Sequence, residues 1–203
     1  MKEETTAINQ FLCRLISSRG RARGAPVIFL HGYMFTSDVW NEIGLLRKLE
    51  TRRIPFTAVD MPYGKLSECQ PKSNNPDENA AIVAAIADSR PPVIVGASLG
   101  GYIALKYSVS HPVAGLLLVA PVMSLQEDLT RHYPDMDAKI RIVYGDADNI
   151  VSRKEMNRLS RLFKTELCVF EAAGHPAYMD APDRFSREVI DLYTTATATE
   201  SLF

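Results

Sequence analysis

Short apolar runs alternate with helical patterns along almost the whole chain. Each run holds four to six mainly aliphatic, β-branched or aromatic residues and is followed by a longer segment of helical period. The expected strands are residues 26–30, 56–59, 92–95, 115–120, 140–144 and 167–170, with helices at 37–49, 77–87, 99–110, 153–164 and 183–193. Such alternation favours right-handed crossovers between parallel strands. The sequence therefore predicts an α/β fold, a mostly parallel central sheet with helices on both faces.

Two short strands are expected within residues 5–17, and the tail at 194–203 is expected to be frayed. A chain of 203 residues is long enough for one well-packed domain, so we expect 1–203 to form a single unit. Its formal net charge of -1 provides no long-range field to attract nucleic acid or an anionic membrane, and neither partner is expected. The oligomeric state is left open.

The three cysteines, Cys13, Cys69 and Cys168, lie far apart in the sequence. Their odd number and spacing are typical of neither a disulfide framework nor a metal site, so we expect reduced thiols. The first thirty residues lack the pattern of a secretory signal, and no apolar run approaches the roughly 20 residues that cross a bilayer. Together these features predict a cytoplasmic protein.

A glycine-flanked serine follows the strand expected at 92–95. Residues 96–100 read Gly-Ala-Ser-Leu-Gly, a G-x-S-x-G pattern between a buried strand and a helix. Reactive groups in parallel sheets gather at the carboxyl ends of the strands. A nucleophile on so tight a turn needs strained angles and close approaches, which favour glycine on either side. The pattern predicts Ser98 as a nucleophile.

A serine hydroxyl needs a base to remove its proton, and the chain has four histidines. His31 lies just before the helix expected at 37–49, where an imidazole more often braces a loop. His111 ends the helix after the serine, and His132 lies in a polar linker. His175 directly follows the last expected strand, at the same sheet edge as Ser98. We therefore predict His175 as the general base.

The base needs a carboxylate to orient it, and Asp146 and Asp148 both follow the penultimate expected strand. Either one completes the chain order of serine, aspartate and histidine. With these motifs the sequence resembles the α/β-hydrolase superfamily across almost its whole length. In that family's G-x-x-D-x-x-V pattern the acid stands three residues after the glycine, which implies Asp148. Asp146 would then brace or cap the loop.

Acyl transfer develops an oxyanion that preorganised donors must meet. One expected donor is the backbone N–H of Leu99, because this residue opens the helix after the nucleophile. The resemblance implies the second, the N–H of Tyr33, because residues 31–34 match the family's H-G-x loop. Residues 60–65 keep only part of the D-x-P-G-x-G-x-S turn of many members. Residues 176–182 are similar to those of small, compact members of the CIB type.

Residues 122–138 are too few to form the helical cap that many members carry. We therefore expect a shallow, open cleft that suits small acyl esters or thioesters better than long lipid chains. The expected rim consists of Tyr33, Met34, Val122, Met123, Tyr178 and Met179. Whether residues 123–138 move over the cleft is left open.

The sequence contains no metal-ligand spacing and no phosphate loop of the form G-x-x-x-x-G-K-[ST], so no metal and no cofactor are expected. The leading hypothesis is a serine hydrolase that acts on small carboxylic esters through an acyl-enzyme. Two alternatives stay open. One is an acyltransferase or perhydrolase that uses a different acceptor, and the other is a non-catalytic interaction module on the same scaffold.

Overall fold

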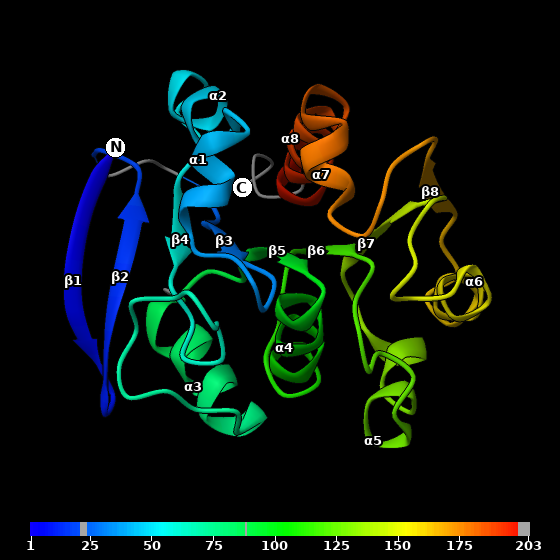
Figure 1. Cartoon of the computed structure of the whole chain (residues 1–203), viewed down its shortest axis with the longest axis horizontal. Coiled ribbons are helices and arrows are strands. Elements are labelled where there is room, and N and C mark those ends of the chain that lie inside the picture. The colour runs from blue at the N-terminus through cyan, green and yellow to red at the C-terminus, as the bar shows by residue number, and fades with distance from the viewer. Residues whose placement is uncertain (21–23, 88, 199–203) are drawn as a thin grey trace.

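The computed structural model describes residues 1–20, 24–87 and 89–198, and an eight-stranded sheet forms its centre (Figure 1). The strand order is β1-β2-β4-β3-β5-β6-β7-β8. The strands are Lys2–Ile8 (β1), Phe11–Ser17 (β2), Val27–Leu30 (β3), Phe56–Val59 (β4), Val93–Ala97 (β5), Gly115–Val119 (β6), Lys139–Gly145 (β7) and Leu167–Phe170 (β8). β2 pairs antiparallel with both β1 and β4, whereas the pairings from β4 to β8 are parallel. The predicted α/β fold is confirmed.

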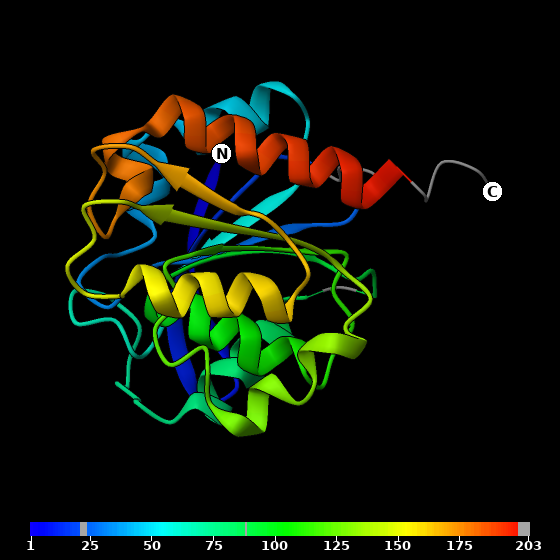
Figure 2. The same cartoon turned by 90° about the vertical axis from the view of Figure 1, so that its right-hand side faces the viewer.

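Helices cover both faces of the sheet (Figure 2). One face carries α1 (Asp38–Glu42), α2 (Leu45–Thr51), α7 (Ala177–Asp180) and α8 (Pro182–Thr197). The other carries α3 (Pro76–Ile86), α4 (Leu99–Ser108), α5 (Glu127–Thr130), the 3-10 turn η1 (Tyr133–Asp135) and α6 (Arg153–Leu162). Strands β3, β5 and β6 are buried on both sides, because each lies between two helical layers.

Two helix boundaries differ from the prediction for local reasons. The single helix expected at 37–49 is split, because Gly44 adopts a left-handed conformation (φ 74°) between α1 and α2. The cap of α3 is Asn75 rather than Asp77. The Asn75 side chain accepts a hydrogen bond from the Asp77 N–H, and a proline occupies the first turn, where its missing donor costs nothing.

The C-terminal helix is longer than expected. α8 continues to Thr197, which corrects the prediction that the chain frays from residue 194. In this last part of the helix the Thr194 hydroxyl donates to the carbonyl of Ile190, one turn earlier, at 2.8 Å. Residues 199–203 of the predicted tail lie outside the described residues.

The segment between β6 and β7 forms no cap in the part of the chain that the structure describes. Its α5 and η1 lie beside α4, on one face of the sheet rather than over the strand ends (Figure 1). Leu129 and Tyr133 bury their side chains in the core of that face, and the Tyr133 hydroxyl donates to the carbonyl of Ser124 at 2.7 Å. The carboxyl edge of the sheet is therefore left uncovered by this segment.

Two cysteines are joined, which contradicts the predicted reduced thiols. Cys13 of β2 forms a disulfide with Cys69 of the loop after β4, whereas Cys168 is free. The physical reason is a contact between segments far apart in the sequence. The loop folds back onto β2, where Leu12 and Gln70 exchange two backbone hydrogen bonds. The disulfide removes the cysteine argument for a cytoplasmic protein. None of the described helices combines the length and the apolar character needed to cross a bilayer.

Candidate active site

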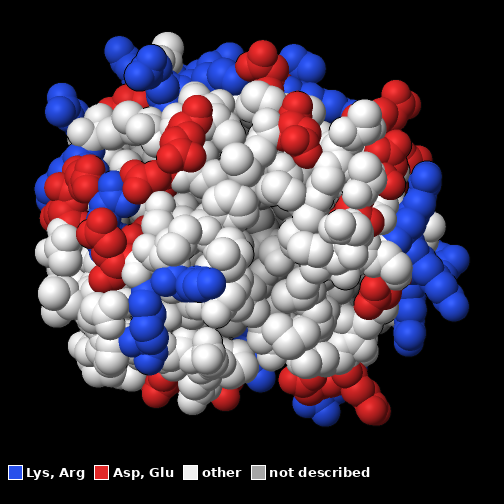
Figure 3. Space-filling model, viewed as in Figure 1, with Lys and Arg blue, Asp and Glu red and all other residues white. Residues whose placement is uncertain are grey.

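The parallel strands end on the face seen in Figure 1, and the predicted catalytic residues lie at this edge. Ser98 directly follows β5, Asp148 lies three residues after β7, and His175 lies in the loop after β8. Figure 3 shows the same face, with a central hollow in largely uncharged surroundings and most Lys, Arg, Asp and Glu toward the periphery. The fold thus brings three residues distant in the sequence to one edge of the sheet.

The backbone at Ser98 is strained. Its φ of 52° and ψ of -113° lie where non-glycine residues are rare, and its N–H donates to the carbonyl of Val119 at 2.9 Å. The flanking glycines are needed because the turn is so close to its neighbours. A Cβ on Gly96 would lie 2.6 Å from the Gly100 oxygen, and one on Gly100 would lie 2.3 Å from the Leu30 oxygen. Such strain at a single serine is typical of a functional position.

One of the two candidate aspartates binds the histidine. Asp148 Oδ2 lies 2.7 Å from His175 Nδ1, and the Asp148 side chain is fully buried. Its other oxygen accepts the backbone N–H groups of Ile150 at 2.7 Å and Val151 at 3.0 Å. Asp146 is exposed, and its backbone N–H bonds to β8. The carboxylate of Asp148 is therefore held on both sides, and it orients the imidazole.

This pairing leaves one ring nitrogen of His175 available. Because a carboxylate only accepts, Nδ1 of a neutral ring carries the proton and Nε2 carries the lone pair. The Nε2 atom is buried and has no hydrogen-bond partner among the described residues. His175 and Ser98 line the same cavity of about 420 Å³. The arrangement suits an imidazole that takes a proton from a hydroxyl in that cavity.

The other histidines lie elsewhere. His111 and His132 line a separate hollow of about 470 Å³, where α3, α4 and α5 meet, away from Ser98. His31 is fully buried, and its Nδ1 lies 2.8 Å from the carbonyl of Gly32, to which it donates, while Nε2 accepts the N–H of Met61 at 3.0 Å. Burial lowers the pKa of His31 and keeps it neutral. As expected, His31 braces a loop.

The cavity wall agrees only in part with the predicted rim. The predicted residues that line it are Tyr33, Met34 and Tyr178, and those absent from its described lining are Val122, Met123 and Met179. Val122 instead packs into the core on the α4 face. Met123 and Met179 expose their side chains to solvent outside the cavity. The prediction chose six residues by their closeness to strand ends in the sequence, whereas side-chain direction decides which residues reach the cavity.

Three apolar residues of the wall, Phe35, Ile150 and Pro176, were not predicted. Pro176 follows His175 and Ile150 lies two residues after Asp148, so closeness to the site in sequence was an available signal. Phe35 packs edge-on against Tyr178, whose ring lies 4.9 Å from that of Trp40. The burial of Tyr178 raises its pKa. An aromatic cluster thus supports the floor of the cavity.

The two predicted oxyanion donors belong to Leu99, which follows Ser98, and to Tyr33, which follows a residue close to Ser98. Leu99 opens α4, where the first backbone N–H groups have no intrahelical acceptor. Gly32 lies against Ser98, because a Cβ on it would be 3.7 Å from the Ser98 Cβ. Tyr33 is the next residue, and its carbonyl accepts the N–H of Lys65 at 2.8 Å. Tyr33 lines the cavity together with Gly32 and Ser98, and Leu99 is the residue that follows Ser98.

The sequence of residues 27–131 matches the Alpha/beta hydrolase family. The chain belongs to this family. It is 30% identical over 179 residues to the "Putative protein-lysine deacylase ABHD14B" of Rattus norvegicus, covering 85% of this chain and 84% of that protein. It is also 28% identical over 170 residues to "Protein ABHD14A" of Homo sapiens, covering 81% and 62% of the two chains.

Among solved structures, this hydrolase is similar to a "predicted CIB-like hydrolase" from Thermoplasma acidophilum. The TM-score is 0.83 at 24% identity, with 94% of this chain and 96% of the other covered. This likeness shows the fold, and that fold is an alpha/beta hydrolase without a cap. Family membership and the relatives support hydrolase chemistry.

Proposed function

We propose that this chain is a serine hydrolase that removes small acyl groups through an acyl-enzyme on Ser98. The observation that carries the proposal is the 2.7 Å contact between His175 Nδ1 and the buried Asp148 carboxylate. It leaves Nε2 as a base in the cavity that the serine lines. In this proposal Ser98 is the nucleophile, His175 the general base and acid, and Asp148 the group that orients the base.

The mechanism follows from these positions. Ser98 Oγ attacks the acyl carbonyl carbon while His175 Nε2 takes the hydroxyl proton. The carbonyl oxygen becomes an oxyanion, and the N–H groups of Tyr33 and Leu99 donate to it. The intermediate collapses, and His175 returns the proton to the departing alcohol, thiol or amine. Water then attacks the acyl-enzyme with His175 again as base, which releases the acid and free Ser98.

The size and lining of the cavity support a small acyl group. A volume of about 420 Å³ must hold the reacting carbonyl and part of the leaving group, and its wall is mostly apolar. Ile150 and Met34 on this wall are 65% and 49% exposed, so the cavity opens to solvent. We propose short-chain carboxylic esters or thioesters as the substrates.

Acylated lysine is a second candidate substrate class. The Rattus norvegicus relative carries the name "Putative protein-lysine deacylase ABHD14B". An uncovered cavity leaves room for an acyl group that is carried on a protein side chain. The same triad would then expel the lysine amine in place of an alcohol.

A panel of p-nitrophenyl esters from acetate to decanoate tests the proposal, with Ser98→Ala as the control. We expect a preference for the shortest chains and a loss of about 10⁴-fold or more in Ser98→Ala. Equal activity of the two proteins would reject the serine mechanism. A preference for decanoate would contradict the assignment of small acyl groups.

Two further measurements separate the alternatives. Partitioning of a trapped acyl-enzyme between water and added thiol, amine or peroxide tests acyl transfer, and partitioning that no acceptor changes argues against it. Labelling of folded protein by a fluorophosphonate tests whether Ser98 is activated. Failure of the probe to label Ser98 would favour a non-catalytic interaction module.

A further inference from the structure

The backbone around Tyr33 has little support of its own. Residues 31–37 follow β3 and contain no helix or strand before α1 begins at Asp38. The side chains of Tyr33 and Met34 are 47% and 49% exposed, so they do little to hold the segment in place. An oxyanion donor acts only if it is already in position when charge develops. Another part of the chain must therefore hold this segment.

Residues 60–73, which we call the clamp loop, supply that support. The N–H of Met61 bonds to the ring of His31, and the Tyr63 hydroxyl donates to the His31 carbonyl at 2.5 Å. The N–H of Lys65 donates to the carbonyl of Tyr33 itself at 2.8 Å.

At the far end of the segment, the buried carboxylate of Asp60 accepts the N–H of Ser37 at 2.7 Å. The segment that carries the proposed donor is thus tied to the clamp loop at both ends and at Tyr33.

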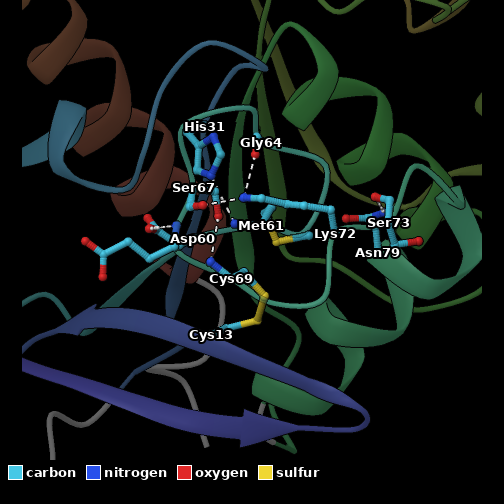
Figure 4. Close-up of a disulfide and its surroundings, with 11 residues drawn as sticks. Cys13, His31, Asp60, Met61, Gly64, Ser67, Cys69, Lys72, Ser73 and Asn79 are labelled. Carbon is cyan, nitrogen blue, oxygen red and sulfur yellow. Dashed lines mark hydrogen bonds between the residues drawn. A yellow bond between two sulfur atoms is a disulfide. The ribbon is translucent and has the colours of Figure 1, made fainter.

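The clamp loop is fastened to itself by two charged groups, the buried carboxylate of Asp60 and the ammonium of the solvent-exposed Lys72 (Figure 4). The second oxygen of Asp60 accepts the N–H of Glu68 at 2.9 Å, which closes the loop into a ring. Lys72 Nζ reaches across this ring and donates to the carbonyls of Gly64, at 2.8 Å, and Ser67. Partial desolvation of the ammonium lowers the pKa of Lys72, while the charge of Asp60 opposes that shift.

The clamp loop is fastened to the sheet by the disulfide. Cys69 is bonded to Cys13 of β2, 56 residues away in the sequence, and neither residue is exposed. Next to it, Gln70 pairs with Leu12 through two backbone hydrogen bonds. Residues 60–73 contain no helix and no named strand, and segments without regular secondary structure open locally more readily than core strands. The disulfide therefore limits how far the loop can move.

We propose that Lys72 and the Cys13–Cys69 disulfide are positioning elements that hold the Tyr33 N–H in place for the reaction. This inference rests on the proposed function, because it assigns the clamp loop a role in the oxyanion hole. The inference goes beyond the proposed function because it makes the rate of acyl transfer depend on a disulfide and a lysine. In the described part of the chain, neither of these contacts Ser98 or His175.

Two variants test the inference, the double variant Cys13→Ala/Cys69→Ala and Lys72→Met. Their matched controls are Cys168→Ala, which removes the free thiol, and Lys65→Met, which removes an exposed lysine of the same loop. No described residue accepts a hydrogen bond from the Lys65 side chain. With p-nitrophenyl acetate we expect kcat of both test variants to fall by about 10- to 100-fold, while KM stays within about threefold. The controls should match wild type.

Reaction with dithiothreitol gives a readout that is independent of catalysis. A thiolate of the reagent attacks the protein disulfide, its S–S bond breaks, two protein thiols form, and the reagent becomes a cyclic disulfide. Because both sulfurs are buried, this reaction requires the clamp loop to open. We expect Lys72→Met to be reduced faster than wild type and Lys65→Met to be reduced at the wild-type rate.

Each outcome decides the inference. It is overturned if folded test variants, or fully reduced wild type, keep the wild-type kcat. It is also overturned if both test variants and fully reduced wild type unfold. The disulfide and Lys72 would then serve the stability of the whole chain rather than the position of the Tyr33 N–H. A fall in kcat with a retained KM, below the unfolding temperature, supports it. If Ser98→Ala were as active as wild type, the proposed function itself would fail, which is a distinguishable result.

Discussion

The candidate site has two parts that are held in place in different ways. The acid–base half consists of Asp148 and His175, and the donor half is the segment that carries the Tyr33 N–H. Asp148 and His175 follow β7 and β8, which are neighbouring parallel strands. The two loops also touch directly, because the N–H of Ala147 donates to the carbonyl of Ala173 at 2.9 Å. Sheet pairing and this contact between neighbouring loops therefore bring Asp148 and His175 together. Short connections from paired strands leave these side chains little freedom.

The donor half depends on contacts across the fold. The Tyr33 segment leaves β3, but its partners lie in the clamp loop, and that loop is anchored to β2 by the disulfide. The candidate site thus combines a part fixed by sheet topology with a part fixed by long-range contacts. Substitutions in the acid–base half should abolish most of the activity, whereas substitutions in the donor half should only lower kcat.

The largest expected effect comes from removing the base. His175→Ala should lower kcat by about 10⁴- to 10⁶-fold, because no other described histidine lines the cavity to replace it. Steady-state hydrolysis of p-nitrophenyl acetate measures this loss, with His132→Ala as a control at wild-type activity. Comparable activity in the two variants would remove His175 from the mechanism.

The next effect concerns the acid. Asp148→Asn keeps the shape of the side chain but loses the charge that orients the imidazole, so kcat should fall by about 10⁴-fold. Asp146→Asn removes a neighbouring, exposed carboxylate and should leave kcat unchanged. The same ester assay measures both variants. A larger loss in Asp146→Asn would reverse the assignment of the acid.

A smaller effect is expected from crowding the donor half. In Gly64→Ala the added Cβ would lie 2.5 Å from His31 Cε1 and 2.8 Å from Ser67 Cβ. The contacts of His31 with the clamp loop, which we call the brace, must therefore shift. We expect kcat to fall by about 10- to 100-fold, because the Tyr33 N–H moves when the brace around His31 moves.

The matched control lies in the acid–base half. In Gly174→Ala the nearest atom, Asp180 Oδ2, would lie 3.6 Å from the added Cβ, an ordinary contact. This variant should have the kcat of wild type in the same ester assay. An unchanged kcat in Gly64→Ala would show that the brace does not position the donor.

The smallest effect is a pH dependence of stability in the donor half. Burial lowers the pKa of His31 below its ordinary value near 6.5, so the unfolded chain binds a proton that the folded chain does not. The contribution of His31 to the free energy of unfolding is therefore full above about pH 6.5 and is lost as the pH falls below it.

Urea unfolding at pH 8, 7, 6 and 5 measures this dependence. His31→Gln carries no titratable group, so its free energy of unfolding should decline less steeply between pH 7 and pH 5 than that of wild type. All other ionisable groups are shared by the two proteins. Parallel declines would mean that His31 is not the group responsible.

The acid–base half was readable from the sequence for a physical reason. Apolar runs mark buried strands, and parallel strands end at one edge, so residues just after them are neighbours. This logic placed Ser98 and His175 at that edge. The resemblance to the family selected Asp148 over Asp146, and in the structure Asp148 binds His175.

What only the tertiary structure decided lies in contacts between segments that are far apart in the sequence. No spacing rule joins Cys13 to Cys69, because their meeting depends on how the clamp loop folds onto β2. The cavity wall also depends on tertiary structure. The Val122 side chain packs against the core, whereas Ile150 lines the cavity. The sequence by itself determined the sheet and the positions of Ser98 and His175 at the ends of its strands, because these follow from local period and strand order. Long-range packing decided the disulfide, the brace around His31 and the shape of the cavity.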